Sequence, residues 1–387
     1  MRLAQLTLAL CFALLPCAAQ SSKSPLLVLL GGDIKTWRAE CQQRGWQFLE
    51  PAEAGKSADQ LVKDLAARAE EAAKSPSVDP NRIYLAAQGA SVSTLFYVAA
   101  RMPDLWAAAV GAGGSPRSAI DSNRLYAANT TNLPVLWLFA NKEEGPLGKK
   151  LKDAGFNLEW RQPEVARLSD IFDWLATHER EPFPSIADCE TGSPIFTHCY
   201  WVEITKFDPG ESNDVLASTR VPPLGSGATL AIGPFGIDAA DKGPGVVVAS
   251  LPDKYAGPLK LNDRIIEMGG KDLKDAADYT QALYQTFDEK PTVLMIARGK
   301  EHVRLETKIV LGPRPEPVTA RVRAQYLPEL QEVEVVSRAI KQMKVTVPVS
   351  WLPVKLNWNG TELATASEAG CWLLDEQKEL LNAKRCQ

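Results

Sequence analysis

Residues 25–180 alternate short apolar runs with longer segments of helical periodicity. The apolar runs lack polar alternation, and the segments between them place apolar residues every three or four positions. Strands that are apolar on both faces and alternate with helices are typical of a parallel sheet covered on both sides. We therefore expect a doubly wound α/β domain over residues 24–182. Its predicted strands are 25–30, 46–49, 82–86, 107–111, 134–140 and 157–161, and its predicted helices are 58–74, 92–101, 119–128, 145–154 and 166–179.

The pattern changes after a Pro-rich stretch at 181–184. Short, glycine-punctuated strands with one helix at 275–284 predict a small domain at 229–312, and an all-β pattern follows over 317–387. Residues 183–228 read as a linker that contains a strand near 196–206. That strand and the later ones are consistent with one β-sandwich interrupted by an insertion, or with a linker strand and a separate β module. Asn359-Gly360 predicts a type I′ hairpin turn.

Composition narrows the classes of function. The 387 residues are 45% hydrophobic and 23% charged with a net charge of −4, which is typical of a folded protein. No block of Lys or Arg stands out, so we expect no nucleic-acid partner and no polybasic membrane contact. The histidines are scattered, no C-x-x-C is present, and Gly31-Gly32-Asp33 lacks the lysine of a phosphate-binding loop. We therefore expect neither a metal site nor a cofactor.

The N-terminus predicts export. One arginine precedes an apolar run, and the small residues after it fit a cleavage site near residue 19. The run is too short to span a bilayer, and no other stretch is apolar enough. We expect a signal peptide at 1–19 and a periplasmic or secreted protein. Lipid anchoring at Cys17 is the alternative, although Pro16 stands where a small residue is wanted.

Five cysteines lie beyond the predicted signal peptide. In an oxidising compartment, Cys189 with Cys199 and Cys371 with Cys386 are candidate disulfides that would each close a short loop. The alternative for both pairs is free, buried cysteine. Cys41 lies in a helical pattern and is expected to be a buried thiol.

Residues 85–92, LAAQGASV, lie between a predicted strand and a predicted helix and have the frame of a nucleophile elbow. With its flanks, this stretch resembles esterases and peptidases of the dienelactone-hydrolase and prolyl-oligopeptidase type, and the resemblance covers residues 25–182. The motif G-x-S-x-G places Ala87 at its first glycine, Gly89 at the nucleophile and Ser91 at its last glycine. Glycine carries no atom that can attack a carbonyl.

The same resemblance implies an acid at Glu143 or Glu144, after the strand 134–140. It also implies a histidine in the loop 160–165, where the sequence has none. His178 falls at the end of the last predicted helix, where it can bind free carbonyls. We therefore expect a non-catalytic, hydrolase-like domain. Two alternatives are an active serine hydrolase that uses Ser91 or Ser93 in displaced geometry, and an unrelated doubly wound domain.

Residues 229–311 resemble a PDZ domain of the bacterial envelope type. The resemblance rests on 233–237 (GPFGI), 245–248 (GVVV) and 257–266 (GPLKLNDRII), followed by the helix 275–284 and the strand 292–298. It implies that an extended peptide pairs with the edge 235–239 and that loop amides between Gly233 and Gly236 receive a carboxylate. The pocket would be lined by Phe235, Ile237, Tyr279 and Leu283. Alternatively, these four side chains only fill a small core.

Together these features predict an exported protein that binds an extended or C-terminal peptide and is not an enzyme. The alternative is a serine esterase or peptidase that recruits its substrate through the PDZ domain and uses Ser91 with Glu143 or Glu144.

Overall fold

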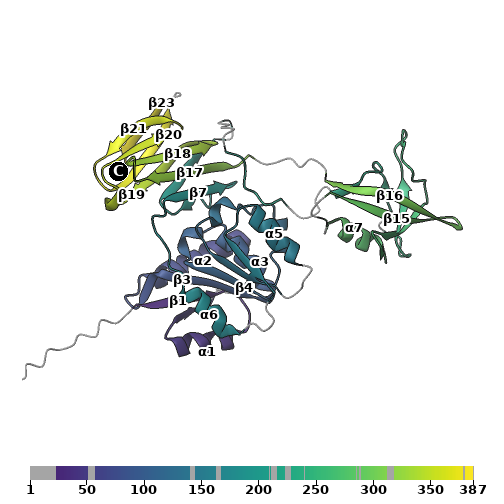
Figure 1. The fold of residues 1–387 in the computed structure, drawn as a ribbon, viewed down its shortest axis with the longest axis horizontal. Helices are drawn as coiled ribbons and strands as arrows, with labels where there is room; N and C mark the ends of the chain where they lie inside the picture. Colours follow the sequence, from purple (N-terminus) through teal and green to yellow (C-terminus); the bar gives the residue numbers. More distant parts are fainter. Residues whose placement is uncertain are drawn as a thin grey trace, which may run out of the picture.

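The structure is a computed structural model. It describes residues 23–50, 57–139, 144–162, 167–208, 210, 216–222, 228–238, 240–284, 286, 289–311, 318–377 and 380–386. Figure 1 shows an α/β domain, a β-sandwich packed beside it, and a third unit that lies apart from both. We call this third unit, residues 228–311, the inserted module. In the part of the chain that the structure describes, no helix is both long and apolar enough to cross a membrane.

The α/β domain is built on a six-stranded parallel sheet in the order β2-β1-β3-β4-β5-β6. Helices α1 and α6 pack on one face through Trp37 and Phe172, whereas α2, α3 and α5 pack on the other face through residues such as Val62 and Phe96. The prediction of an α/β sheet is thus confirmed. The strands are β1 (Ser24–Leu29), β2 (Gln47–Leu49), β3 (Val78–Gln88), β4 (Ala108–Ala112), β5 (Val135–Leu138) and β6 (Leu158–Arg161).

The helices of this domain follow the predicted order with one difference. They are α1 (Ile34–Arg44), α2 (Ala58–Ala73), α3 (Val92–Ala99), α4 (Arg117–Asp121), α5 (Gly145–Asp153) and α6 (Leu168–Ala176). The helix predicted over 119–128 is wrong, because α4 is a single short turn that ends before Asn123, which has a φ of 58°. A left-handed residue ends a helix.

Two five-stranded sheets face each other in the β-sandwich, in the orders β21-β20-β18-β17-β7 and β23-β22-β19-β9-β8. They enclose one hydrophobic core that includes Trp201, Met343 and Trp358. Strands β7 (Ile186–Thr191), β8 (His198–Cys199) and β9 (Val202–Phe207) precede the inserted module. The strands that follow it are β17 (Ala320–Leu327), β18 (Glu332–Arg338), β19 (Ile340–Val347), β20 (Val354–Trp358), β21 (Thr361–Ala366), β22 (Gly370–Gln377) and β23 (Leu380–Arg385).

Both sheets therefore combine strands from before and after residues 228–311: β7 pairs with β17, and β9 pairs with β19. The segment 183–228 contributes three strands to this sandwich, where the sequence predicted a linker with one. Disulfides join Cys189 to Cys199 and Cys371 to Cys386, and Cys41 is a buried free thiol.

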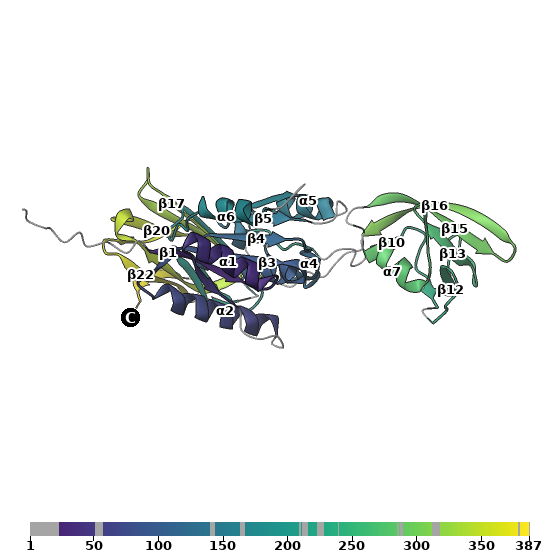
Figure 2. The ribbon, with the colours of Figure 1, turned by 90° about the horizontal axis from the view of Figure 1, so that it is seen from below.

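The inserted module is one sheet in the order β10-β16-β15-β13-β12-β11, with β14 paired to β13, and a single helix, α7 (Ala276–Tyr284). Seen from below, the sheet curves around the helix (Figure 2). Its core includes Val248, Ile265 and Leu294. The strands are β10 (Ala228–Leu230), β11 (Gly236–Ile237), β12 (Val246–Ser250), β13 (Arg264–Met268), β14 (Lys271–Asp272), β15 (Lys290–Arg298) and β16 (Glu301–Leu311).

Residue Glu190, in β7, links the α/β domain to the chain segments that precede and follow the inserted module. Its backbone N–H donates to Oδ1 of Asn129 in the α/β domain (2.7 Å), and its C=O accepts from Nδ2 of the same side chain (3.0 Å). Its fully buried carboxylate accepts from the Ser218 hydroxyl, from the Thr219 amide and hydroxyl, and from the Thr319 hydroxyl at 2.5–2.7 Å. Ser218 and Thr219 precede the inserted module and Thr319 follows it, so one carboxylate holds both of its connections.

We predict that Glu190→Ala lowers the free energy of unfolding by about 3–5 kcal/mol, because it leaves the Ser218, Thr219 and Thr319 hydroxyls without their acceptor and removes the ion pair with Arg338 (3.6 Å). Thermal and urea unfolding measure the change. The control is Glu203→Ala in β9, whose partner Lys344 is 38% exposed; its ion pair should contribute no more than about 1 kcal/mol. Equal losses in the two variants would contradict this role of Glu190.

Candidate functional site

The turn after β3 keeps the geometry of a nucleophile elbow. Gln88 ends the strand, Gly89 has a φ of 64°, a 3₁₀ turn covers Gly89–Ser91, and α3 begins at Val92. A Cβ built on Gly89 would meet no atom within 4 Å. Position 89 therefore points into open space at the carboxyl edge of the sheet, where parallel α/β sheets hold their ligands.

Three other glycines close the neighbouring loops against this turn. A Cβ on Gly31 would lie 2.3 Å from Ser91 Oγ, one on Gly32 would lie 2.5 Å from Gln88 Cβ, and one on Gly114 would lie 1.8 Å from the Gly89 carbonyl oxygen. The loops after β1 and β4 reach the elbow only because these positions have no side chain. The close contact between the elbow and the neighbouring loops thus depends on these glycines.

Gln88, the last residue of β3, is hydrogen-bonded to the loop after β1 and to α1. Its Oε1 accepts hydrogen bonds from the Asp33 backbone N–H (3.1 Å) and from Trp37 Nε1 (3.2 Å). The Asp33 amide lies in the loop after β1, so a side chain of the elbow itself satisfies it. No pattern in the sequence indicates this contact, because Gln88 and Asp33 are 55 residues apart.

The predicted alternative acids and nucleophile are not joined in one network. Ser91 is half-buried and its hydroxyl faces Gly31. Glu144 lies at the start of α5, beyond β5, and β4 separates β5 from β3. Among the described residues no hydrogen bond connects Ser91 to Glu144, and Glu143 lies outside them.

None of the three histidines lies at the elbow. His178 follows α6 and binds the Trp174 carbonyl through Nδ1 (2.9 Å). The backbone carbonyl of His178 accepts a hydrogen bond from the hydroxyl of Tyr84. Tyr84 lies five residues before Gly89 along β3, which corresponds to about 16 Å at 3.3 Å per residue. His302 lies in β16 of the inserted module.

The third, His198 in β8, contacts the opposite edge of the α/β domain. Its Nδ1 lies 2.8 Å from Oδ2 of Asp104, which precedes β4. The hydrogen bond to Asp104 raises the pKa of His198, with smaller contributions from Glu203 and Glu70. This pair joins the β-sandwich to the amino edge of the parallel sheet, away from the elbow.

In the inserted module, the structure brings the four predicted pocket residues to one hydrophobic cluster. The rings of Phe235 and Tyr279 lie 6.4 Å apart. Tyr279 is only 7% exposed, and burial raises its pKa to about 12, whereas Phe235, Ile237 and Leu283 are half-buried. Gly233 has a φ of 86°. Of the predicted edge 235–239, Ala239 lies outside the described residues.

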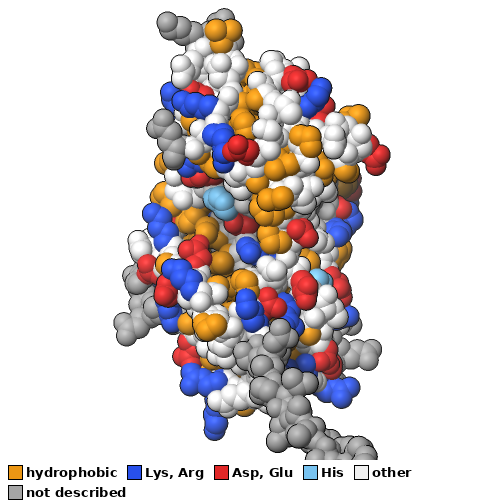
Figure 3. Space-filling model, turned by 90° about the vertical axis from the view of Figure 1, so that its left-hand side faces the viewer, with side chains coloured by type: hydrophobic (Ala, Val, Ile, Leu, Met, Phe, Trp, Pro, Cys, Tyr) orange, Lys and Arg blue, Asp and Glu red, His pale blue; other side chains and the backbone are white. Residues whose placement is uncertain are grey.

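Among the described residues, no group of three or more His, Cys, Asp or Glu could hold a metal ion. On the face shown in Figure 3, acidic, basic and hydrophobic side chains are interspersed, and no patch of one charge covers it.

Comparisons with known proteins give limited similarity. No family model matches this chain, and no curated protein matches it. Among solved structures, a thermostable esterase matches with 17% identity and a TM-score of 0.30 over 42% of this chain. This chain spans 56% of the length of that esterase. A second structure, esterase PE8, matches with 14% identity and a TM-score of 0.30, over 41% of this chain and 94% of its own.

We predict that the His198–Asp104 pair makes stability depend on pH. Because the folded-state pKa of His198 is raised, its contribution is fully present below about pH 6.5 and is lost as the pH rises through the folded value. The side chain is half-exposed, so the loss should not exceed about 1 kcal/mol. Urea unfolding from pH 5 to 9 measures it. His198→Gln should remove this dependence and His302→Gln should retain it; the reverse result would refute the assignment.

Proposed function

We propose that this chain is an exported, non-catalytic binding protein. Its α/β domain keeps the shape of a hydrolase without the chemistry, and its inserted module acts as a PDZ-like reader of extended or C-terminal peptides. The observation that carries the first part is the bare elbow tip: Gly89 stands where a nucleophile would stand, with open space before it.

Three independent features support the absence of catalysis at the elbow. No oxygen or sulfur is attached at position 89, so no covalent intermediate can form there. All three histidines of the chain lie elsewhere, and the loss of a general base typically costs a factor of roughly 10²–10⁴ in rate. The Asp33 amide already donates to Gln88, so an oxyanion would have to displace that side chain.

Two features of the inserted module support peptide binding. Among the described residues, strand β11 forms one end of the sheet and pairs with β12 alone, so its other side is available to an added strand. No described residue accepts a hydrogen bond from the backbone amides of Gly233 or Phe235. Unpaired amides in a glycine-containing turn suit a carboxylate. The half-buried side chains of Phe235, Ile237 and Leu283 would then contact the peptide.

We predict that a fluorophosphonate probe does not label the purified protein, because no serine of the described residues is hydrogen-bonded to a histidine. Mass spectrometry of the intact protein measures labelling, with an active serine esterase as the positive control. Labelling that Ser91→Ala abolishes would instead establish the alternative, a serine hydrolase that uses Ser91, which lies next to the loop after β1.

We also predict that Leu283→Ser weakens peptide binding by about tenfold, because it removes apolar surface from the side of α7 that faces β11. The probe is a library of free-carboxylate heptapeptides, with the best binder then titrated by calorimetry. Leu261→Ser is the matched control, since Leu261 is 56% exposed in the same module. If amidation of the peptide and Leu283→Ser both leave binding unchanged, the groove beside β11 is not the site.

A further inference from the structure

The inserted module has a second open edge, at the opposite end of its sheet from β11. Strand β16 runs from Glu301 to Leu311, but β10 pairs only with its last three residues, from Ile309 to Leu311. One more bond, from the Ala231 amide to the Lys308 carbonyl (2.9 Å), extends that ladder before the chain turns away. On its other side β16 is paired with β15 along residues 301–309.

The register fixes which backbone groups face this free edge. The Lys308 carbonyl points toward β10, so alternate residues before it, Glu306 and Arg304, present their N–H and C=O to the same side. Among the described residues, no strand pairs with that side of β16 before Lys308. An unpaired row of donors and acceptors is a template for another extended chain.

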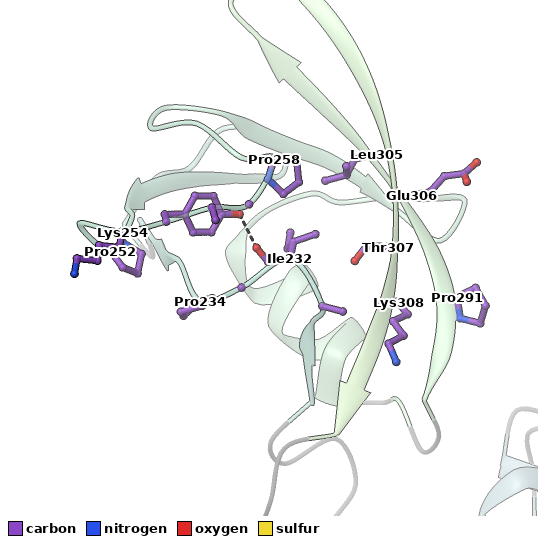
Figure 4. A pocket seen from close by; sticks show the side chains of 15 residues that line it. Ile232, Pro234, Pro252, Lys254, Pro258, Pro291, Leu305, Glu306, Thr307 and Lys308 are labelled. Atoms are coloured by element: carbon purple, nitrogen blue, oxygen red, sulfur yellow. Dashed lines mark hydrogen bonds between the residues drawn. The ribbon is translucent and has the colours of Figure 1, made fainter.

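A pocket of about 910 Å³ opens beside this edge, where the chain diverges from β16. Figure 4 shows Leu305 and Thr307 projecting from the strand toward Ile232 and Pro258, whereas Glu306 projects the other way. The volume is that of a ligand-binding site, about 300–1,000 Å³. The lining is mostly apolar and consists of Ala231, Ile232, Gly233, Pro234, Pro252, Lys254, Tyr255, Ala256, Gly257, Pro258, Pro291, Leu305, Glu306, Thr307 and Lys308.

The far wall of the pocket is fixed in place. The Tyr255 hydroxyl donates to the Ile232 carbonyl (2.7 Å) across Gly257, where a Cβ would lie 2.2 Å from that hydroxyl. This bond holds the loop around Tyr255 against the start of the chain that leaves β10. The pocket is thus bounded by a braced loop on one side and an unpaired strand on the other.

One buried polar atom of β16 has no partner among the described residues. Oγ1 of Thr307 is inaccessible to solvent and makes no hydrogen bond with any described residue. A buried hydroxyl without a partner costs about 1–3 kcal/mol. Here the atom belongs to a residue that lines the pocket.

We propose that β16 binds an extended peptide as an added strand, at a site separate from the groove beside β11. The peptide would pair with the backbone of Arg304 and Glu306. Every second side chain, which should be apolar, would enter the pocket near Leu305 and Thr307.

The charges along β16 indicate which side chains the peptide would carry on the face that points away from the pocket. The outward positions of β16 carry Arg304, Glu306 and Lys308. Arg304 and Glu306 pair with each other at 2.6 Å. Lys308 is exposed and lies 4.0 Å from the Glu289 carboxylate. Acidic side chains therefore fit the outward positions of the partner strand.

The test uses the full chain and a blocked peptide, acetyl-Val-Asp-Phe-Asp-Val-Asp-amide, which has no free carboxylate. Glu306→Pro removes one N–H at the free edge and none from the ladder with β15, and proline is tolerated at such edge positions. The matched control, Glu306→Thr, removes the same charge but keeps the N–H. We expect binding at least tenfold weaker in Glu306→Pro, and within about threefold of the parent protein in Glu306→Thr.

Hydrogen exchange locates the peptide independently of any variant. Protection that appears at Arg304 and Glu306 supports the proposal, and protection confined to Gly236 and Ile237 overturns it and assigns the peptide to β11. Equal loss of affinity in both Glu306 variants also overturns it, because the side chain would then be responsible. Self-association of the chain that Glu306→Pro abolishes would identify a second copy as the occupant in place of a partner peptide.

Discussion

The buried carboxylate of Glu190 is the interaction on which the arrangement of this molecule depends. A carboxylate that loses its water needs several strong donors, and here the donors come from the segments before and after the inserted module. Its backbone meanwhile completes the hydrogen bonds of Asn129 in the α/β domain. Both connections of the inserted module therefore start from one point. A module held this way can lie apart from the other two units while the β-sandwich remains intact (Figure 1).

The elbow shows how a strand-to-helix turn keeps its shape without a side chain at its tip. A residue with a side chain held at a positive φ costs roughly 1–2 kcal/mol, which an enzyme sustains because the strain orients its nucleophile. Glycine adopts the φ of 64° at position 89 without that cost. The loops at Gly32 and Gly114 still pack against the turn. Glycine at position 89 thus leaves the turn unstrained while the loops around it stay closely packed.

Patterns among residues close in the sequence predicted those features of the fold that depend on residues close in the sequence. The parallel strands and α7 follow from apolar periodicity, and Asn359 with Gly360 forms the predicted hairpin turn, with φ values of 47° and 80°. The sequence did not determine which strands before the inserted module pair with strands after it. β7 and β17 are about 130 residues apart, and periodicity does not indicate which strands pair. The hydrogen bond from the Asp33 amide to Gln88 was missed for the same reason. The short α4 shows the converse, since helical spacing continued past Asn123 while the backbone did not.

The two edges of the inserted sheet differ in how they are protected, and this difference bears on function. Proteins usually cover or shorten an edge strand, because an exposed one pairs with whatever extended chain it meets. Strand β11 is two residues long and lies at the end of the sheet. Strand β16 is eleven residues long, and its uncovered half carries alternating charges that deter unspecific pairing. The charged side chains limit which peptide strands can pair with β16, but they do not block the edge itself. The exposed half of β16 therefore favours a selective contact over a purely structural one.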